Sequence, residues 1–475
     1  MKTTTPSIGV IIGNRDFFPD HLVGEARADI ERFARQAAFD PVMLTPDDTK
    51  LGGVETFDDA QKCAALFRAH RERIAGVLVV LPNFGTEKGV ADTLKLAALN
   101  VPVLVQAYPD TLGKLDVIHR RDAWCGKISV CNNLRQAGIP FTLTASHVTH
   151  PGAPSFAQDI GRFIAVCRVA GGLRKVRIGA VGARPGAFNT VRYSEKILER
   201  HGISVTTVDL SEILGAAAKL EDRHRRVTAK IDEINAYADA SAVPPARLLQ
   251  MARLGVVLDD FVAENHLDAT AIQCWNSLQQ NHGCNVCTSM SMMSEKLLPS
   301  ACEVDVTGAL TMHAMQLASG SPSALVDWNN NYADDPDKCV LFHCGNWAKS
   351  FTPGVRVSSA PILGSSLGVE NTWGALDGRA PAGPLTYGRI TTDDTGGTMR
   401  AYVGEGELTH DDLPTFGNRA VARVPRLQAL MRHVCREGFE HHVVMNASLT
   451  AAILEEAFTR YLGWEVYHHA KTDES

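Results

Sequence analysis

The sequence predicts an α/β protein with two Rossmann-like, doubly wound α/β domains followed by a β-rich, barrel-like C-terminal domain. Three observations support this prediction: strands and helices alternate up to about residue 170, a second such series opens at residue 175, and the composition changes near residue 346. Apolar strands that alternate with amphipathic helices are typical of parallel sheets covered on both faces. The length of 475 residues also favours two or three domains over a single core.

The first domain is predicted to span residues 1–172. Continuous apolar runs predict buried strands at residues 8–12, 41–44, 75–81 and 101–105, and apolar residues at helical spacing predict helices over residues 22–38, 58–74 and 86–98.

The second domain is predicted to span residues 173–345 and to carry the acidic site residues. Its expected elements are strands at residues 175–182, 204–208 and 269–275, a long helical stretch over residues 212–265, a helix over 308–318, and strands 323–327 and 339–343 that complete its sheet.

The third domain is predicted to span residues 346–475 and to be rich in β-structure. Gly, Pro, Ser and Thr become more frequent, helical patterns disappear, and short alternating runs such as residues 385–391 and 398–403 predict strands. A helix is expected again at residues 449–461, followed by a strand at 465–468.

The composition indicates an ordinary globular enzyme of the cytoplasm. The chain has 45% hydrophobic and 21% charged residues and a formal net charge of -6, which favours neither nucleic acid nor an anionic membrane as partner. The apolar run at residues 7–13 has the length of a strand, not of a signal peptide or a membrane span. We therefore expect a cytoplasmic location.

The cysteines predict reduced thiols. Their number is eleven, and they show no disulfide framework spacing. One C-x-x-C occurs at residues 284–287, but the second pair that a zinc ribbon needs does not follow. We interpret these cysteines as buried or site-lining thiols.

Glu303 is the most informative residue, because it is a carboxylate within the small, apolar run at residues 301–310. Burying such an anion is costly unless a cation or hydrogen bonds compensate it. Two interpretations are open: a carboxylate that accepts hydrogen bonds at a helix N-terminus, or a metal ligand. Asp305, two residues later, suits the role of helix cap better.

Three further positions could join Glu303. Asp327 and His343 end predicted strands, although Asp327 could also cap the polar turn that follows and His343 could be a core histidine. The pair His441–His442 lies in a predicted strand, where one ring points inward and the other outward, so only one of them should be a ligand. Such an oxygen-rich set suits Mn²⁺, with Mg²⁺ or Co²⁺ as alternatives.

Candidate substrate-binding residues follow predicted strands at the edge where ligands of open α/β sheets bind. They are Arg15, after the first strand, and Gln273, Trp275 and Asn276, at the end of the strand 269–275. Arg15 could instead belong to a solvent-facing loop. The loop at residues 182–186 lacks the spacing of a nucleotide-binding motif.

The order and spacing of these residues resemble the L-fucose isomerase / L-arabinose isomerase superfamily, over nearly the whole chain. Glu303, Asp327 24 positions later, and His441 or His442 near the C-terminus match the metal ligands of fucose isomerases. His343 falls where the arabinose isomerase branch has a further ligand. That branch has Glu where this chain has Asp327, so the resemblance leaves the sugar open.

The resemblance implies a metal-dependent isomerase that interconverts an aldose and its ketose through an enediol. Glu303 and Asp327 would be the metal-bound acid/base pair, and Arg15, Gln273 and Trp275 would contact sugar hydroxyls. Activity should fall on acidification, because a protonated histidine cannot bind metal. The resemblance also implies a homo-oligomer (a hexamer, trimer or dimer) with its sites near subunit interfaces.

Two other functions would fit the same scaffold. One is a sugar-binding or sensor protein without catalysis or metal. The other is a different metal enzyme, such as an epimerase or an aldolase, but we find no lysine at a predicted strand end that would serve as the Schiff base of an aldolase.

Overall fold

The computed structural model of the protein describes residues 5–37 and 39–471. The chain divides into two compact units, which are considered separately. The first consists of Met1–Gly171 with Glu456–Gly463, and the second of Gly172–Glu455 with Trp464–Ser475.

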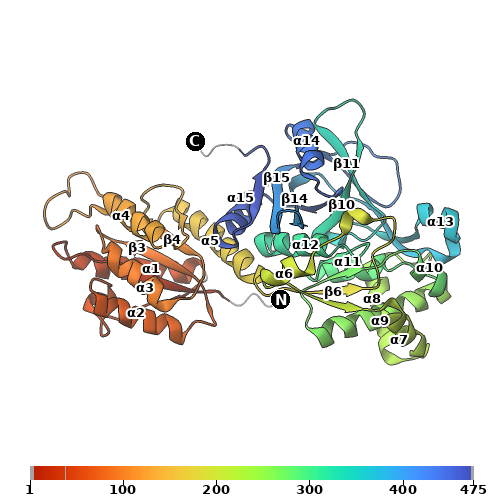
Figure 1. Ribbon diagram of the computed structural model, residues 1–475, viewed down its shortest axis with the longest axis horizontal. Helices are drawn as coiled ribbons and strands as arrows, with labels where there is room; N and C mark the ends of the chain where they lie inside the picture. The colour runs from red at the N-terminus through yellow and green to blue at the C-terminus, as the bar shows by residue number, and fades with distance from the viewer. Residues whose placement is uncertain (1–4, 38, 472–475) are drawn as a thin grey trace. The chain divides into compact units, whose positions relative to one another are not determined.

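The first unit, red to orange in Figure 1 apart from its short C-terminal segment, contains a five-stranded parallel sheet in the order β2-β1-β3-β4-β5. Its strands are β1 (Ser7–Ile12), β2 (Asp40–Val42), β3 (Ile74–Leu81), β4 (Val103–Ala107) and β5 (Thr142–Leu143), and its helices are α1 (His21–Ala37), α2 (Phe57–Ala69), α3 (Glu87–Ala97), α4 (Ala123–Gln136) and most of α5 (Pro154–Leu173). Both faces of the sheet are covered. Ile8 and Val10 of β1 pack with residues of α1 and α5, and Ile11 packs with residues of α2, α3 and α4.

The second unit contains a four-stranded parallel sheet in the order β7-β6-β8-β9. Its strands are β6 (Arg177–Val181), β7 (Ser204–Val208), β8 (Ala269–Ile272) and β9 (Ser300–Ala301), and the helices that accompany them are α6 (Glu195–Arg200), α7 (Leu210–Lys219), α8 (Arg225–Tyr237), α9 (Pro245–Asn265), α10 (Ser277–Asn281), α11 (Cys287–Glu295) and α12 (Val306–Ser319). The helical stretch predicted over residues 212–265 is therefore three helices. Asp209 caps the first of them, and a proline at its first position starts α9.

A nine-stranded mixed sheet makes up the rest of the second unit, in the order β12-β13-β16-β11-β10-β17-β14-β15-β18. Its strands are β10 (Ser323–Asn331), β11 (Lys338–His343), β12 (Arg356–Ser359), β13 (Trp373–Arg379), β14 (Gly383–Asp393), β15 (Thr398–Leu408), β16 (Asn418–Arg423), β17 (His442–Asn446) and β18 (Glu465–His468). Because β15 also pairs with β16, six of these strands form a closed ring of paired strands. They are β16, β11, β10, β17, β14 and β15.

Two expectations about this region are wrong. The runs at residues 323–327 and 339–343 do not complete the parallel sheet; as β10 and β11 they pair antiparallel with each other inside the mixed sheet. An apolar run shows that a strand is buried but does not identify its partner. Helices also do not disappear after residue 346, since α13 (Pro361–Leu367) and α14 (Leu427–Glu437) occur there, whereas α15 (Ala451–Glu456) lies within the helix expected at residues 449–461.

The broad prediction is confirmed: parallel α/β sheets come first and a large mixed β-sheet follows. The domain boundaries at residues 172/173 and 345/346 stay a prediction.

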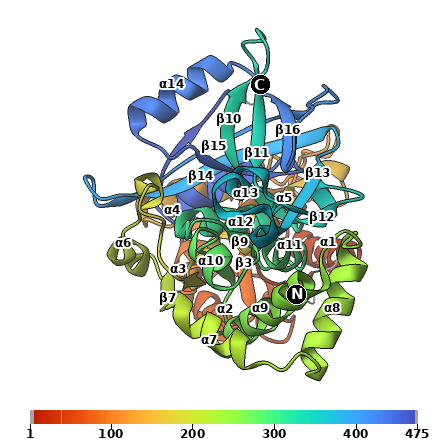
Figure 2. The same cartoon turned by 90° about the vertical axis from the view of Figure 1, so that its right-hand side faces the viewer.

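Helix α12 lies between the two sheets of the second unit. It contacts β8 and β9 of the parallel sheet and β10, β14 and β17 of the mixed sheet, and nearly all of its side chains are buried. Figure 2, which faces this unit, shows α12 near the centre with β10, β11 and β16 on one side and α9 on the other. A helix that is apolar on all sides is stable only in such surroundings. Its N-terminus is consequently deep inside the unit.

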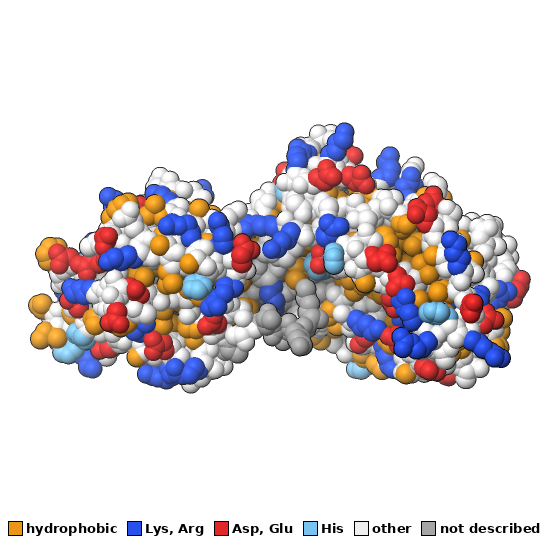
Figure 3. Space-filling view, turned by 90° about the horizontal axis from the view of Figure 1, so that it is seen from below, with side chains coloured by type: hydrophobic (Ala, Val, Ile, Leu, Met, Phe, Trp, Pro, Cys, Tyr) orange, Lys and Arg blue, Asp and Glu red, His pale blue; other side chains and the backbone are white. Residues whose placement is uncertain are grey.

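Among the described residues, none of the helices has the length and apolar character that crossing a bilayer requires. Acidic and basic side chains are interspersed over the face seen in Figure 3.

Trp347 provides a test of the support beneath β10. Its side chain is fully buried, and its Nε1 donates a hydrogen bond to the carbonyl of Leu325 at 3.1 Å. We expect Trp347→Ala to lower the free energy of unfolding by about 3–5 kcal/mol and Trp347→Phe, which loses the hydrogen bond but keeps a ring, by about 1–2 kcal/mol. Urea denaturation measures both; equal losses would show that the ring does not pack as described.

Candidate active site

Glu303 lies in the tight turn between β9 and α12. Glu303 and Val304 both have positive φ, at 53° and 56°, a left-handed conformation that is uncommon for non-glycine residues and costly for a β-branched one. The turn places the carboxylate in a buried position, 5% exposed. Oε1 accepts hydrogen bonds from Trp275 Nε1 at 3.0 Å and from Cys274 Sγ at 3.5 Å, whereas Oε2 has no hydrogen-bond partner among the described residues.

Asp305, not Glu303, caps the helix. Its side chain accepts a hydrogen bond from the backbone N–H of Gly308 at 2.8 Å, as the sequence predicted. The interpretation of Glu303 as a helix cap is therefore wrong, which leaves its buried charge to be explained by other groups.

Asp305 also belongs to a buried network of charges. Arg389, from β14, donates to both of its carboxylate oxygens, at 2.6 and 2.8 Å, and also lies 3.1 Å from Glu440. Burial alone would raise the pKa of Asp305, but Arg389 and His442 more than offset this and hold it below its usual range. Asp305 is thus ionised, and the pKa of Arg389 is raised in turn.

This network sets the orientation of His442. The Nδ1 of His442 donates to Asp305 Oδ2 at 2.8 Å, which leaves the lone pair of Nε2 free. Nε2 lies 3.5 Å from Asp327 Oδ1 and 3.8 Å from Glu303 Oε2. A histidine that donates its other nitrogen to a carboxylate is the usual form of a metal ligand.

Strand register explains why Asp327 and His442 meet. In the antiparallel pair of β10 and β17, Asp327 is directly opposite His442. His441, one residue earlier, has a side chain that is 44% exposed, whereas that of His442 is 1% exposed. The expected inward and outward alternation is thus present, and His442 is the inward residue.

His343, at the end of β11, is arranged differently. The backbone N–H of Cys344 donates to its Nδ1 at 3.0 Å, so the ring proton of the neutral form resides on Nε2. Nε2 is 3.6 Å from Glu303 Oε2. Burial disfavours a charged ring, but Cys344 and Glu303 outweigh it and raise the pKa of His343 well above its usual value. His343 thus lies beside Glu303 with its Nε2 turned towards the carboxylate.

The two carboxylates have different environments. Burial would raise the pKa of Glu303, but His343 and His442 hold it below its ordinary value. Burial does raise the pKa of Asp327, with Glu303 adding to the effect and the histidines opposing it. Carboxylates whose pKa values are pushed in opposite directions are suited to act as base and acid.

These groups face a cavity of about 260 Å³ in the second unit. Its polar lining consists of Glu303, Asp327, His343, Cys344 and His442, and its apolar lining of Phe188, Trp275, Phe342, Phe416 and residues 360–363 at the start of α13. The ring of Phe188 contacts those of Trp275 and His442, with centroids 5.2 and 5.9 Å apart. The cavity thus joins one polar wall to several aromatic ones.

Of the predicted substrate-binding residues, the structure brings Trp275 to this cavity. Gln273 and Asn276 are not among the residues that line it; Gln273 Oε1 accepts a hydrogen bond from the backbone of Ala183 at 2.9 Å. Arg15 lies in the first unit, where it pairs with Glu87 and stacks on Phe84. Contacts of these residues with a substrate stay predictions.

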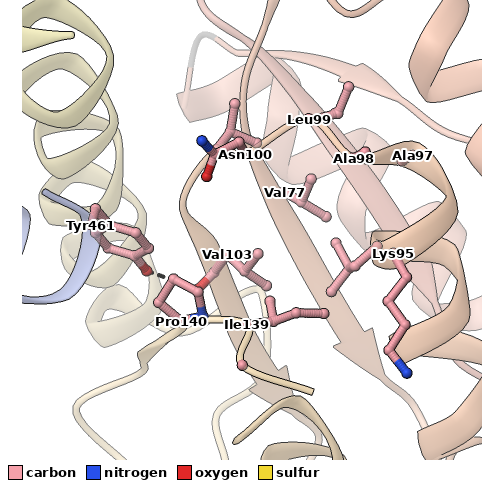
Figure 4. Close-up of a pocket in the computed structure, with 13 residues that line it drawn as sticks. Val77, Lys95, Ala97, Ala98, Leu99, Asn100, Val103, Ile139, Pro140 and Tyr461 are labelled. Atoms are coloured by element: carbon pink, nitrogen blue, oxygen red, sulfur yellow. Dashed lines mark hydrogen bonds between the residues drawn. The ribbon is translucent and has the colours of Figure 1, made fainter. Parts of the chain in front are cut away.

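A cavity of about 270 Å³ in the first unit offers different chemistry (Figure 4). Aliphatic residues such as Val77 and Ile139 form most of its wall, and the hydroxyl of Tyr461 donates to the carbonyl of Val103 at 3.4 Å. None of the described residues that line it is a carboxylate, histidine or cysteine. It therefore offers no carboxylate, imidazole or thiol to a metal ion, and its polar side chains are those of Lys95, Asn100 and Tyr461.

Sequence reasoning missed several site residues. Phe188 and the start of α13 come from loops without a distinctive pattern. Arg389 could have been found, because it is a charged residue inside the otherwise uncharged run at residues 385–391, in the same way that Glu303 interrupts an apolar one.

Among the sets of side chains that could hold a metal ion, two contain histidines. Ligand atoms of Glu303, His343 and His442 lie within 4.8 Å of one another, and so do those of Asp327, His441 and His442. The unpartnered, buried Oε2 of Glu303 fits a bound cation, because a buried carboxylate oxygen without a donor is otherwise costly.

Two family models match this chain. Residues 9–174 match the N-terminal domain of fucose/sulfoquinovose isomerases, and residues 341–469 match the C-terminal domain of L-fucose isomerase.

Curated relatives carry the name sulfoquinovose isomerase. That of Alkalicoccus urumqiensis is 23% identical over 370 residues, which cover 75% of this chain and 78% of the relative. That of Priestia megaterium is 23% identical over 380 residues, with 77% and 80% covered, and that of Clostridium sp. (strain MSTE9) is 25% identical over 327 residues, with 66% and 71% covered. These names favour catalysis over a sugar sensor.

The role of Asp305 can be tested through stability. We expect Asp305→Asn to lower the free energy of unfolding by about 3–5 kcal/mol, because it removes the carboxylate that accepts two hydrogen bonds from Arg389 and leaves Glu440 as the remaining partner of that buried charge. The matched control is Asp327→Asn, whose side chain is 23% exposed to the cavity and makes no arginine pair. Urea denaturation should show the control within about 1 kcal/mol of the parent protein. Equal losses in the two variants would contradict the assignment.

Proposed function

This chain is an aldose–ketose isomerase that belongs to the fucose isomerase-like family, and from that premise we propose that Glu303 and Asp327 are its acid/base pair at a divalent-metal site. The observation that carries the proposal is the buried Oε2 of Glu303, which has no hydrogen-bond donor among the described residues and lies 3.8 Å from Nε2 of His442, in a cavity that Asp327 also lines.

Glu303, Asp327 and His442 would hold the cation. Their two carboxylates and one imidazole suit Mn²⁺, or Mg²⁺ or Co²⁺. His442 is prepared for this role by Asp305, which fixes the proton on Nδ1. His343, whose Nε2 is 3.6 Å from Glu303 Oε2, is proposed as a positioning neighbour of Glu303, and the exposed His441 as a neighbour of Asp327. When bound, a divalent cation would hold two adjacent substrate oxygens and stabilise the charge that develops on them.

Proton transfer is assigned to the two carboxylates. Glu303 is ionised and removes the proton from C2 of the open-chain aldose, which gives an enediol, and it returns that proton to C1 to give the ketose. Asp327, whose pKa is raised, carries the hydroxyl proton from O2 to O1. Trp275 positions Glu303 by donating to Oε1, so that Oε2 remains the free oxygen.

The aromatic wall binds the rest of the sugar and excludes water. Phe188 covers Trp275 and His442 and presents an apolar surface to the C–H groups of the substrate. The sugar is a free pentose or hexose, with 6-deoxy and 6-substituted hexoses included. The relatives' name adds sulfoquinovose to the sugars to be tested.

We also propose that the protein is a homo-oligomer with its sites near subunit interfaces. Support comes from the first unit, where the loop at residues 109–122 exposes large apolar side chains. Leu112 is 95% exposed, Val117 81% and Ile118 63%, and Trp124 follows at the start of α4 with 57%. Several such residues in one short segment are typical of a surface that another molecule covers.

Isotope exchange tests the catalytic assignment. The chelator-stripped protein, reloaded with Mn²⁺, is mixed with each sugar in D₂O, and deuterium at C2 is measured by NMR. We expect exchange with at least one sugar and a loss of about 10³-fold or more in Glu303→Gln and Asp327→Asn. Stripping the metal should abolish exchange, and Mn²⁺ should restore it.

The control is His441→Asn, a change at an exposed ring, which should retain exchange within about tenfold. A Glu303 or Asp327 variant with near-parental exchange would remove that residue from the pair. Absence of exchange with every sugar, with metal demonstrably bound, would overturn the isomerase mechanism.

Light scattering tests the oligomer. We expect the parent protein to exceed the mass of one chain, 51.4 kDa, and Leu112→Ser/Val117→Ser to shift it towards the monomer. Leu449→Ser, at a leucine 61% exposed in the second unit, should leave the mass unchanged. A monomeric parent protein would contradict the proposal.

A further inference from the structure

Three cysteines from different parts of the second unit converge beside the active site. Cys287 is the first residue of α11, Cys302 lies in the turn after β9, and Cys344 follows β11. Their Sγ atoms all lie within 4.8 Å of one another, and those of Cys287 and Cys344 are 4.0 Å apart. All three are free thiols.

More sulfur surrounds this set. The thioether of Met290, on α11, lies 4.0 Å from Cys302 Sγ. The thiol of Cys274 is within 4.8 Å of Cys302 in a second group, which also contains Glu303. Sulfur ligands select soft ions such as Zn²⁺ and Cu⁺ over Mg²⁺ or Mn²⁺.

The spacing suits tetrahedral coordination. With Zn–S bonds of about 2.3 Å, two thiolates on one zinc ion are about 3.8 Å apart. The 4.0 Å between Cys287 and Cys344 is close to this value before any ion draws the sulfurs inward. The third thiol, within reach of both, distinguishes the set from a pair poised for a disulfide.

The set is buried but reachable. Cys287 and Cys302 are buried, while Cys344 is partly exposed and lines the active-site cavity. An ion could thus enter through the same cavity as the substrate.

We propose that Cys287, Cys302 and Cys344 bind a thiophilic metal ion of the Zn²⁺ class, at a site separate from the oxygen-rich set of Glu303 and Asp327. The ion would tie α11 to the two segments that carry Glu303 and His343, since Cys302 immediately precedes Glu303 and Cys344 immediately follows His343. Its role would be to position those two side chains.

Metal analysis of the full-length protein tests the proposal. The protein is purified under reducing conditions, dialysed with Zn²⁺ and freed of loosely bound ions. We expect about one zinc per chain by mass spectrometry. With Co²⁺ in place of Zn²⁺, we expect an intense thiolate-to-metal charge-transfer band in the near ultraviolet.

Variants identify the ligands. Cys287→Ser and Cys344→Ser should lose the band and bind zinc at least tenfold more weakly. Two control variants should keep both the band and the zinc affinity. Cys63→Ser alters a buried thiol of the first unit, and Cys284→Ser alters the cysteine of the C-x-x-C motif that does not belong to the set. Glu303→Gln should also keep the band, which separates this site from the proposed catalytic one.

A measurement on the parent protein alone can overturn the proposal. The proposal is wrong if Co²⁺ gives no charge-transfer band under conditions where the thiols are shown to be free. Retention of the band in both the Cys287 and the Cys344 variant would also overturn it. A Cys287–Cys344 disulfide found by mass spectrometry in the protein as isolated from cells would replace the metal site with a redox pair. Because none of these measurements uses a sugar, failure of the isomerase mechanism would not affect the result.

Discussion

The buried ion pair between Asp305 and Arg389 is the interaction on which the rest of the site depends. Both side chains are fully inaccessible, and each compensates the buried charge of the other, with Glu440 as a second partner of Arg389. Asp305 uses one carboxylate to cap α12, to neutralise an arginine of β14 and to orient His442 of β17. Gly308 permits this approach, because a Cβ at its position would lie 2.5 Å from Asp305 Oδ2. The network therefore joins the central helix to the mixed sheet and prepares one histidine as a ligand.

The turn that carries Glu303 has a strained backbone, which the surrounding structure stabilises. Two consecutive residues in the left-handed region store backbone strain, which persists only where the surrounding structure determines the turn on both sides. On one side β9 is part of the parallel sheet, and on the other the capped α12 is enclosed between two sheets. The turn consequently delivers a buried carboxylate whose Oε1 is occupied by Trp275 and whose Oε2 is left for chemistry.

The sequence could predict those parts of the fold and of the site that leave a pattern in neighbouring residues, but not those that depend on contacts between distant ones. Continuous apolar runs identified β1 to β4 of the first unit but not the two-residue β5, and the charge of Glu303 inside an apolar run singled out that residue, because both are local signals. The partners of β10 and β11 could not be found in this way, since a buried strand has the same pattern in a parallel and an antiparallel sheet. The convergence of Cys287, Cys302 and Cys344 was likewise invisible, because the fold, and not a spacing motif, brings them together. The C-x-x-C was misleading, since only Cys287 of the pair joins the set.

Two ligand sets of opposite chemical character now lie side by side in one unit. Oxygen and nitrogen donors of Glu303, Asp327 and His442 suit a hard ion such as Mn²⁺, but any such set binds Zn²⁺ more tightly than Mn²⁺ when both are present. A neighbouring thiolate set changes that competition, because sulfur draws Zn²⁺ away from oxygen ligands. The two sets share no residue, although Cys302 is next to Glu303 and Cys344 is next to His343 in the sequence. An ion in the sulfur set would therefore leave the donors of the oxygen set free. An isomerase with the proposed oxygen-rich metal site would gain selectivity for its ion from such an arrangement, as well as a fixed geometry.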